Sequence, residues 1–191
     1  MKFFKKSKDK EEVEGSTSKE ELKFLQVCVG ELSRGSVVVE IGSHRGRSAI
    51  AMGKIAIDRG VLVYAVDPHL PFTGVNGREF GPTDLDYMYG ALVEHGVGES
   101  VFVVSLKSTK AAMAWDDSSV DLLFLDGDHS DAAVRADVSA WSSKIRPGGK
   151  IAFHDSYLDG VKSTILELES TGYWSRVNEA GSIVALCRND A

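Results

Sequence analysis

Apolar residues gather in short runs along the chain, and most runs are continuous rather than alternating with polar residues. Continuous runs are typical of strands that are covered on both faces, as in a parallel sheet. Helical patterns separate most of these runs, and this alternation favours a doubly wound α/β architecture. We therefore predict one mostly parallel, seven-stranded sheet with the strands Val37–Ile41, Val61–Val66, Val101–Val104, Val120–Leu125, Lys150–Phe153, Trp174–Asn178 and Ser182–Cys187.

Helices are predicted where apolar residues recur at intervals of three and four. In the first helix, Ser18 is the expected N-cap, Glu21 is its capping-box partner, and Gly35 is the expected C-terminal cap. The other helices supply the crossover connections that parallel strands require. They are predicted over Arg47–Arg59, Asp131–Ile145 and Asp159–Glu169.

The last two predicted strands break the parallel pattern. Only Glu179, Ala180 and Gly181 separate them, and a connection this short cannot contain a crossover helix. The sheet is therefore predicted to end in an antiparallel C-terminal hairpin.

The composition is that of a globular domain. The 191 residues are 43% hydrophobic and 26% charged, so we expect a single domain with a sizeable core over residues 17–191. Residues 1–16 are charged and lack periodicity, which predicts a mobile tail. Cys28 and Cys187 lie far apart in apolar runs, so we expect two buried, reduced thiols.

Charge and hydropathy narrow the expected partners and location. The net charge of −6 offers no global basic surface for nucleic acid. No run reaches the ~18 apolar residues of a membrane span, and no apolar segment follows the basic N-terminus as it would in a signal peptide. We expect a cytoplasmic protein that binds neither nucleic acid nor membrane. Its N-terminal helix could pack on a second copy in a homo-oligomer.

A glycine turn follows the first predicted strand, which ends in Glu40 and Ile41. Gly42 and Gly46 carry no Cβ atom, so the backbone can approach a ligand closely there. A helix that begins at Arg47 would also point free N–H groups at that ligand. The turn predicts a site for a nucleoside-type cofactor, although two glycines four residues apart are also consistent with an ordinary strand–turn–helix connection.

Further candidate groups follow the second and third predicted strands. Asp67 lies about 20 residues beyond the turn, where an acid can accept hydrogen bonds from ribose hydroxyls; the alternative is a cap of the following turn. Pro68–Thr83 is rich in proline and glycine and is predicted to be a lid or substrate-contacting loop; the alternative is a disordered insertion. Ser105, Leu106, Lys107 and Ser108 follow the third strand, at an edge that could meet an adenine ring.

Five ionisable residues follow two predicted strands that should be neighbours. Asp126, Asp128 and His129 follow one strand, and His154 and Asp155 follow the next. Because the carboxyl ends of parallel strands meet at one edge, we expect these groups to converge. Carboxylates of Asp126 and Asp155 suit Mg²⁺, whereas a histidine ligand favours Mn²⁺, Fe²⁺ or Zn²⁺. The alternative is a structural cluster in which Asp128 caps the next helix.

Taken in order, these motifs resemble the class I S-adenosylmethionine-dependent methyltransferases, which have a Rossmann-like sheet. The closest branch is the methyltransferase 24 type, which is related to metal-dependent O-methyltransferases. The resemblance covers about residues 36–187 and depends on Glu40–Ser48, Val66–Asp67, Leu123–His129, Arg146–Gly149 and Phe153–Asp155.

The resemblance implies a role for each matching position. Asp67 would hold the ribose, Ser105 and Leu106 would border the adenine, and Asp126 would lie against the cofactor. Catalysis would depend on Asp126, Asp128 and His129, with Asp128 as a candidate base; a metal-free protein could instead use His129 or His154 as the base. A divalent cation would be held by Asp126, His154 and Asp155, although His154 stands where metal-binding relatives often carry an acid. The methionine part of the cofactor would be surrounded by Glu40, Gly42, Ser43, Gly46 and Ser48.

The expected activity is methyl transfer from S-adenosylmethionine to the hydroxyl of a small molecule or sugar, with or without a divalent cation. Two alternatives stay open at this point. An NAD(P)-dependent oxidoreductase would share the glycine turn and the ribose acid. A non-catalytic, cofactor-binding subunit would share the fold.

Overall fold

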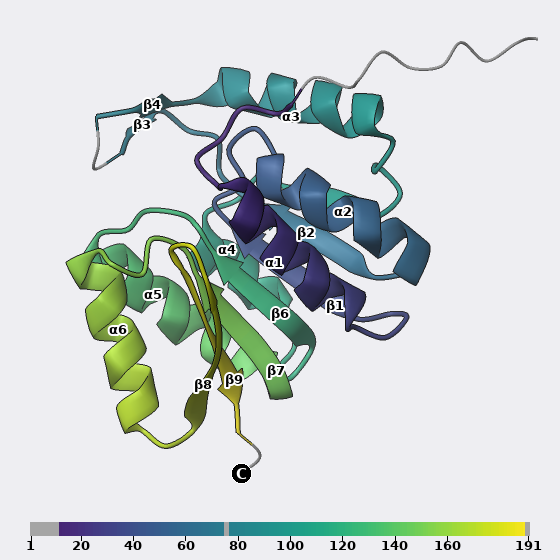
Figure 1. Ribbon diagram of the computed structural model, residues 1–191. Helices are drawn as coiled ribbons and strands as arrows, with labels where there is room; N and C mark the ends of the chain where they lie inside the picture. The colour runs from purple at the N-terminus through teal and green to yellow at the C-terminus, as the bar shows by residue number, and fades with distance from the viewer. Residues whose placement is uncertain (1–11, 75–76, 190–191) are drawn as a thin grey trace, which may run out of the picture.

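The computed structural model describes residues 12–74 and 77–189 and contains one seven-stranded sheet (Figure 1). Its strands are β1 (Val37–Ile41), β2 (Leu62–Val66), β5 (Val101–Val104), β6 (Val120–Leu125), β7 (Ile145–Phe153), β8 (Trp174–Ala180) and β9 (Ile183–Arg188). Their order is β5-β2-β1-β6-β7-β9-β8, and the first five run parallel. β9 is antiparallel to both β7 and β8. The mostly parallel sheet and its C-terminal hairpin are thus confirmed.

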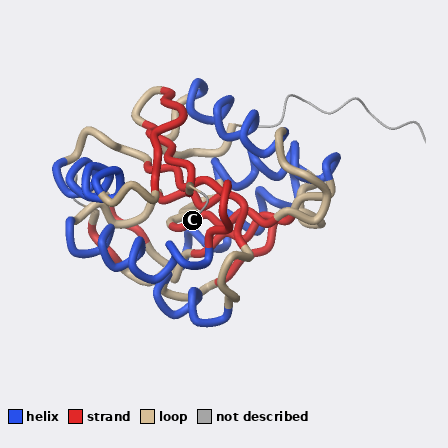
Figure 2. Tube along the Cα trace, turned by 90° about the horizontal axis from the view of Figure 1, so that it is seen from below, coloured by secondary structure: helices blue, strands red, loops and turns tan. Residues whose placement is uncertain are grey.

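Helices cover both faces of this sheet (Figure 2). One face packs against α1 (Lys19–Gly30), α2 (Arg47–Arg59) and α3 (Pro82–His95). The other packs against α4 (Ser108–Ala111), α5 (Asp131–Trp141) and α6 (Asp159–Ser170). Successive strand residues enter opposite cores, as Val38 and Val39 do in β1. Both faces of the sheet are therefore buried, which is why its strands read as continuous apolar runs.

Several helix ends follow the sequence signals, and two do not. The Ser18 capping box begins α1, and α2 has the predicted bounds. However, α1 ends at Gly30, so the prediction that Gly35 caps it was wrong; Gly35 lies in the following turn with φ of 85°. The predicted helix over residues 131–145 is also too long. After α5 a short 3₁₀ helix follows, and Ile145 pairs with Val120 as the first residue of β7.

The Pro68–Thr83 segment is ordered where the structure describes it. β3 (Phe72–Thr73) and β4 (Glu79–Phe80) form a small antiparallel hairpin, and Pro82 begins α3. The Phe80 ring packs edge-on against His44 of the glycine turn, with ring centroids 5.1 Å apart. The hairpin therefore lies over the turn between β1 and α2.

The predicted tail lies partly outside the described residues, which begin at residue 12. Residues 12–17, called the N-terminal strap below, lie against α2. Arg47 donates to the carbonyl oxygens of Thr17 and Val13 at 2.8 and 2.5 Å and forms an ion pair with Glu12 at 2.8 Å. No helix in the described part of the chain is long and apolar enough to cross a membrane.

The two cysteines are both free thiols in the described residues. Cys28 is buried, as predicted, but Cys187 is partly exposed at the last strand. The prediction that both thiols are buried was therefore wrong for Cys187, because it lies near the end of β9, where the sheet meets solvent.

Candidate functional site

The glycine turn joins β1 to α2 and lies against the end of β6. Gly42 has φ of 85°, and a Cβ atom there would come 2.3 Å from the carbonyl oxygen of Asp126. Gly46 is the N-cap of α2 in a left-handed conformation, with no side chain to cap the helix. The first N–H groups of α2 are therefore open to a ligand above the turn.

Asp67 fastens the glycine turn to the end of β2. Its two carboxylate oxygens accept hydrogen bonds from the backbone N–H groups of His44, at 2.9 Å, and His69, at 2.8 Å. Nε2 of the buried His69 ring lies 2.9 Å from the carbonyl oxygen of His44. Asp67 thus caps the turns around it and also faces the pocket described next.

A pocket of about 580 Å³ opens above these strand ends. Its walls come from the glycine turn, the β3–β4 hairpin, the start of α4, the ends of β2, β6 and β7, the inner face of α5 and the N-terminal strap. This volume is in the range of small-molecule and cofactor sites. Six aspartates line the pocket together with three cationic side chains, those of Arg47, Arg78 and Lys107; the aspartates are Asp67, Asp84, Asp126, Asp128, Asp137 and Asp155.

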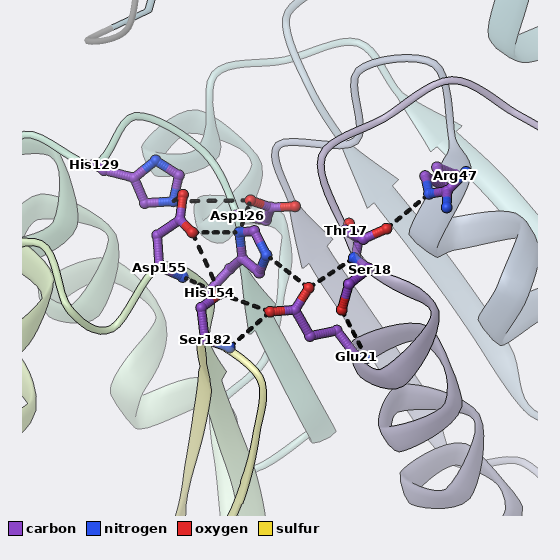
Figure 3. Close-up of polar contacts among 9 residues, drawn as sticks. All are labelled: Thr17, Ser18, Glu21, Arg47, Asp126, His129, His154, Asp155 and Ser182. Atoms are coloured by element: carbon purple, nitrogen blue, oxygen red, sulfur yellow. Dashed lines mark hydrogen bonds and ion pairs between the residues drawn. The ribbon is translucent and has the colours of Figure 1, made fainter.

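A cluster of carboxylates and imidazoles lies at the ends of β6 and β7 (Figure 3); Asp126, His129 and Asp155 line the pocket, and His154 is buried beside them without lining it. Nδ1 of His154 lies 2.9 Å from Oδ1 of Asp126 and 3.6 Å from Oδ1 of Asp155. Nε2 of His129 lies 3.8 Å from Oδ1 of Asp126 and 3.9 Å from Oδ2 of Asp155. The structure therefore brings together four of the five groups that were expected to converge.

The fifth group, Asp128, is turned toward the helix that follows. Its Oδ1 accepts a hydrogen bond from the N–H of Ser130 at 2.9 Å, at the start of α5. Asp128 still lines the pocket. The capping alternative thus describes one contact of Asp128, while its predicted role as a base stays a prediction.

The cluster carries unusual proton affinities. Burial lowers the pKa of His154, but the carboxylates of Asp126, Asp155 and Glu21 outweigh it and raise the pKa to about 9. Burial likewise raises the pKa of Glu21, but hydrogen bonds from Ser18 and Ser182 outweigh it and hold that pKa at about 2. His154 is therefore an imidazolium at neutral pH when no cation is bound, and Glu21 beside it is ionised.

Some predicted cofactor residues lie in the pocket wall and others do not. Gly42, Ser43, Ser48, Asp67 and Asp126 line it. Glu40, Gly46, Ser105 and Leu106 are not among the lining residues.

The reasons for the exceptions are local. Glu40 is fully buried in the sheet below the turn, and Gly46 faces Met88. After β5 the backbone turns, with Leu106 N–H donating to Val104, so the pocket edge falls to Lys107, Ser108 and Thr109 instead. The contacts of Ser105 and Leu106 with adenine stay predictions, while Lys107 and Ser108 of the same predicted edge do line the pocket.

Three pocket groups were missed by the sequence reasoning. Asp137 faces the pocket from α5 together with Ala133 and Ala136. Ala136 and Asp137 follow Ala133 by three and four residues, and this helical spacing could have indicated that the three residues share one face of the helix. Burial raises the pKa of Asp137 to about 6. Arg47 and the strap residues also line the pocket, but no local sequence signal links them.

The residues present fit both a nucleoside cofactor and a cation. The close approach at Gly42 leaves a backbone cradle that a side chain would fill. Nε2 of His129 and Nδ1 of His154 are buried and make no aligned hydrogen bond. One ring nitrogen of each histidine and a carboxylate oxygen of Asp126 all lie within 4.8 Å of one another. His129 thus joins Asp126 and His154 as a candidate ligand, and Asp155 lies beside them.

The arrangement of sheet, glycine turn and acidic strand ends defines a class I methyltransferase fold. A family model described as a methyltransferase domain (methyltransferase 24) matches residues 39–156. The chain belongs to this family of S-adenosylmethionine-dependent methyltransferases. Its predicted family membership is confirmed.

Solved structures agree on the fold. A methyltransferase from Geobacter sulfurreducens has a TM-score of 0.68 at 14% identity, over 90% of this chain and 80% of that one. Precorrin 8W decarboxylase from Methanobacterium thermoautotrophicum has a TM-score of 0.63 at 21% identity, over 94% of both chains. The 1,6-didemethyltoxoflavin-N1-methyltransferase of Burkholderia thailandensis, solved with S-adenosylhomocysteine, has a TM-score of 0.58 at 16% identity, over 88% and 76%.

A curated relative covers less of the chain. The uncharacterized protein y4gI of Sinorhizobium fredii is 31% identical over an alignment of 128 residues, which covers 62% of this chain and 13% of that protein. The chain thus spans a small part of this relative's length.

Proposed function

We propose that this methyltransferase transfers the methyl group of S-adenosylmethionine to a hydroxyl of a small molecule or sugar, with the help of a divalent cation. The observation that carries the proposal is that the glycine turn and the Asp126 cluster line one pocket. A cofactor above the turn would place its methyl group next to the cluster. The proposal thus combines a donor site and an acceptor-activating site within one cavity.

The pocket residues favour a cationic donor and a fixed geometry. The pocket lining has more carboxylates than cationic side chains, an excess that favours a sulfonium ion. The sulfonium supplies an already activated methyl group, so the main task of the protein is alignment, which can supply ~7–11 kcal/mol of barrier reduction. Asp67 and the α2 N-terminus hold the cofactor, and the β3–β4 hairpin excludes water above it.

The residues of the cluster would activate the acceptor hydroxyl for attack on the methyl group. Asp126, His129 and His154 would hold the cation, which lowers the pKa of a hydroxyl that it contacts. Asp128, which lines the pocket next to these groups, takes the proton. His154 is not the base in this proposal, because one ring nitrogen would hold the cation and Nε2 faces Glu21.

Methyl transfer to a panel of sugar and phenolic hydroxyls, measured with methyl-labelled S-adenosylmethionine, tests this proposal. Asp126→Ala is expected to abolish transfer while S-adenosylhomocysteine affinity stays within a few-fold of wild type. Asp86→Ala, an exposed acid of α3, is the matched control and is expected to keep full activity. Full activity of Asp126→Ala would refute the role of the cluster. Binding of NADH in place of S-adenosylhomocysteine would favour an oxidoreductase.

A further inference from the structure

Glu21 lies at the meeting point of three segments that are far apart in the chain (Figure 3). Its Oε1 accepts hydrogen bonds from the N–H and the hydroxyl of Ser182, both at 2.7 Å. Its Oε2 accepts from the N–H of Ser18 at 2.7 Å and lies 3.4 Å from Nε2 of His154. One carboxylate therefore connects the start of α1, the β8–β9 turn and the end of β7.

These contacts exceed what a capping box requires. A capping-box glutamate satisfies one backbone N–H group at its own helix start. Glu21 is instead only 4% exposed and also meets donors more than 130 residues away in the chain. The β8–β9 turn is shaped around it, because a Cβ atom at Gly181 would come 2.7 Å from Oε1 of Glu21.

We propose that Glu21 is the positioning residue for His154, and that it does so by holding the proton on Nε2 so that Nδ1 faces Asp126. The two ring nitrogens of a histidine are distinct, and the partner of one decides what the other can do. A carboxylate can only accept, so Nε2 must donate to it. Nδ1 is then the atom that is presented to the cluster, 2.9 Å from Asp126.

Because Glu21 belongs to α1, this helix supports the site indirectly, through the contact with His154. Histidines that bind metals commonly donate their second N–H to a carboxylate, which fixes the orientation of the ring. This role rests on the proposed function only for the chemistry of Nδ1, which would bind the cation. The orientation of the ring itself requires neither a cation nor a methyl donor. Glu21 touches neither pocket nor reacting atoms, so its effect passes through His154.

The test is an NMR measurement of the histidine ring protons in ¹⁵N-histidine-labelled full-length protein, without cation or cofactor. The His154 signal is assigned by its loss in His154→Gln. Wild type is expected to show an Nε2–H proton on His154 that is protected from exchange with water. Glu21→Gln is expected to lose this protection, because the amide oxygen stays with the shorter contacts to the N–H and hydroxyl of Ser182, which leaves an NH₂ group that cannot accept facing Nε2 of His154.

Two controls separate positioning from helix stability. Glu20→Gln makes the same change at the neighbouring, exposed acid of the first helical turn, and Ser18→Ala removes the hydroxyl cap of α1. Both are expected to keep the protected proton, even where Ser18→Ala lowers the melting temperature. If Glu21→Gln does not fold, Glu21→Asp replaces it, since aspartate still suits a helix start but withdraws the carboxylate from His154.

An unchanged His154 proton in the folded Glu21 variant, or no protected Nε2–H in wild type, would overturn the inference. Co²⁺ titration separates this result from the proposed function. Glu21→Gln is expected to weaken Co²⁺ binding about 10- to 100-fold. A wild-type protein with the protected proton but no Co²⁺ affinity would support the role of Glu21 and remove the cation from the proposed function.

Discussion

Gly42 and Asp126 touch through their backbones, since a Cβ atom on Gly42 would lie only 2.3 Å from the carbonyl oxygen of Asp126. Two motifs that are more than 80 residues apart in the chain are thereby held in contact. The backbone N–H of Asp126 also donates to the carbonyl oxygen of Ile41 at 2.8 Å. The glycine is therefore needed to bring the cofactor turn and the acidic cluster together.

Gly42→Ala is expected to destabilise the fold by about 2–5 kcal/mol. A left-handed backbone costs a residue with a Cβ atom about 1–2 kcal/mol, and overpacking adds about 1–3 kcal/mol. Gly35→Ala is the control, because Gly35 also has φ of 85° but nothing within 4 Å. Urea unfolding should show that Gly35→Ala loses only the cost of the left-handed backbone, about 1–2 kcal/mol of unfolding free energy. Equal losses in the two variants would show that the contact with Asp126 is not tight.

The buried Glu40 is expected to make stability fall as pH rises. Burial, reinforced by the charges of Asp126 and Asp67 and opposed by Ser48, raises its pKa to about 8. Between its ordinary pKa of 4.5 and this value, the folded protein holds a proton that the unfolded chain has released. The stability that the neutral acid contributes is thus complete below pH ~4.5 and lost by pH ~8. The free energy of unfolding falls by roughly 5 kcal/mol at most over this range.

Glu40→Gln, a neutral replacement of the same shape, removes this titration. The variant is expected to be more stable than wild type at pH 8 and equally stable at pH 4.5. Chemical unfolding at a series of pH values measures the difference. Parallel stability curves for the two proteins would contradict an elevated pKa at Glu40.

Asp67→Asn is expected to weaken S-adenosylhomocysteine binding about 10- to 100-fold. Hydrogen bonds to a charged group contribute about 1.5–3 kcal/mol, and Asp67 both faces the pocket and holds the turn through His44 and His69. Isothermal calorimetry measures the affinity, with Asp86→Asn on exposed α3 as the control. An unchanged affinity would remove Asp67 from the ribose site.

Arg47→Lys is expected to loosen the N-terminal strap. The guanidinium reaches two carbonyl oxygens and Glu12 at once, which a single ammonium group cannot do. The loss of one to two hydrogen bonds should make the strap detach more often from α2. We therefore expect a glutamate-specific protease to cleave after Glu14 about 10-fold faster. Arg59→Lys, at the exposed end of the same helix, is the control. Equal cleavage rates in the two variants would show that Arg47 does not hold the strap.

Local signals in the sequence predicted most of the fold. The Ser18 capping box, the bounds of α2 and the antiparallel hairpin depend on neighbouring residues, and all are confirmed. The end of α5 was misjudged because Ile145 has an apolar spacing that suits a helix, whereas its pairing with Val120 is a tertiary contact.

The site was predictable only as far as strand order allowed. Parallel strands bring their carboxyl ends to one edge, so the meeting of Asp126, His129, His154 and Asp155 followed from the expected topology. The contact between Glu21 and His154 did not, because it spans 133 residues and Glu21 reads as an ordinary capping residue. The sequence indicated the edge after β5 as far as Ser108, but which of its residues line the pocket depends on where the chain turns after β5.

The central claim is that the glycine turn and the Asp126 cluster form one methyl-transfer site. A crystal structure with S-adenosylhomocysteine and Mn²⁺, recorded with anomalous data, tests it most directly. The predicted result is the cofactor above Gly42 with its sulfur toward the cluster, and an anomalous peak between Asp126, His129 and His154. The cofactor bound elsewhere, or Mn²⁺ absent from these three residues at saturating concentration, would contradict the account.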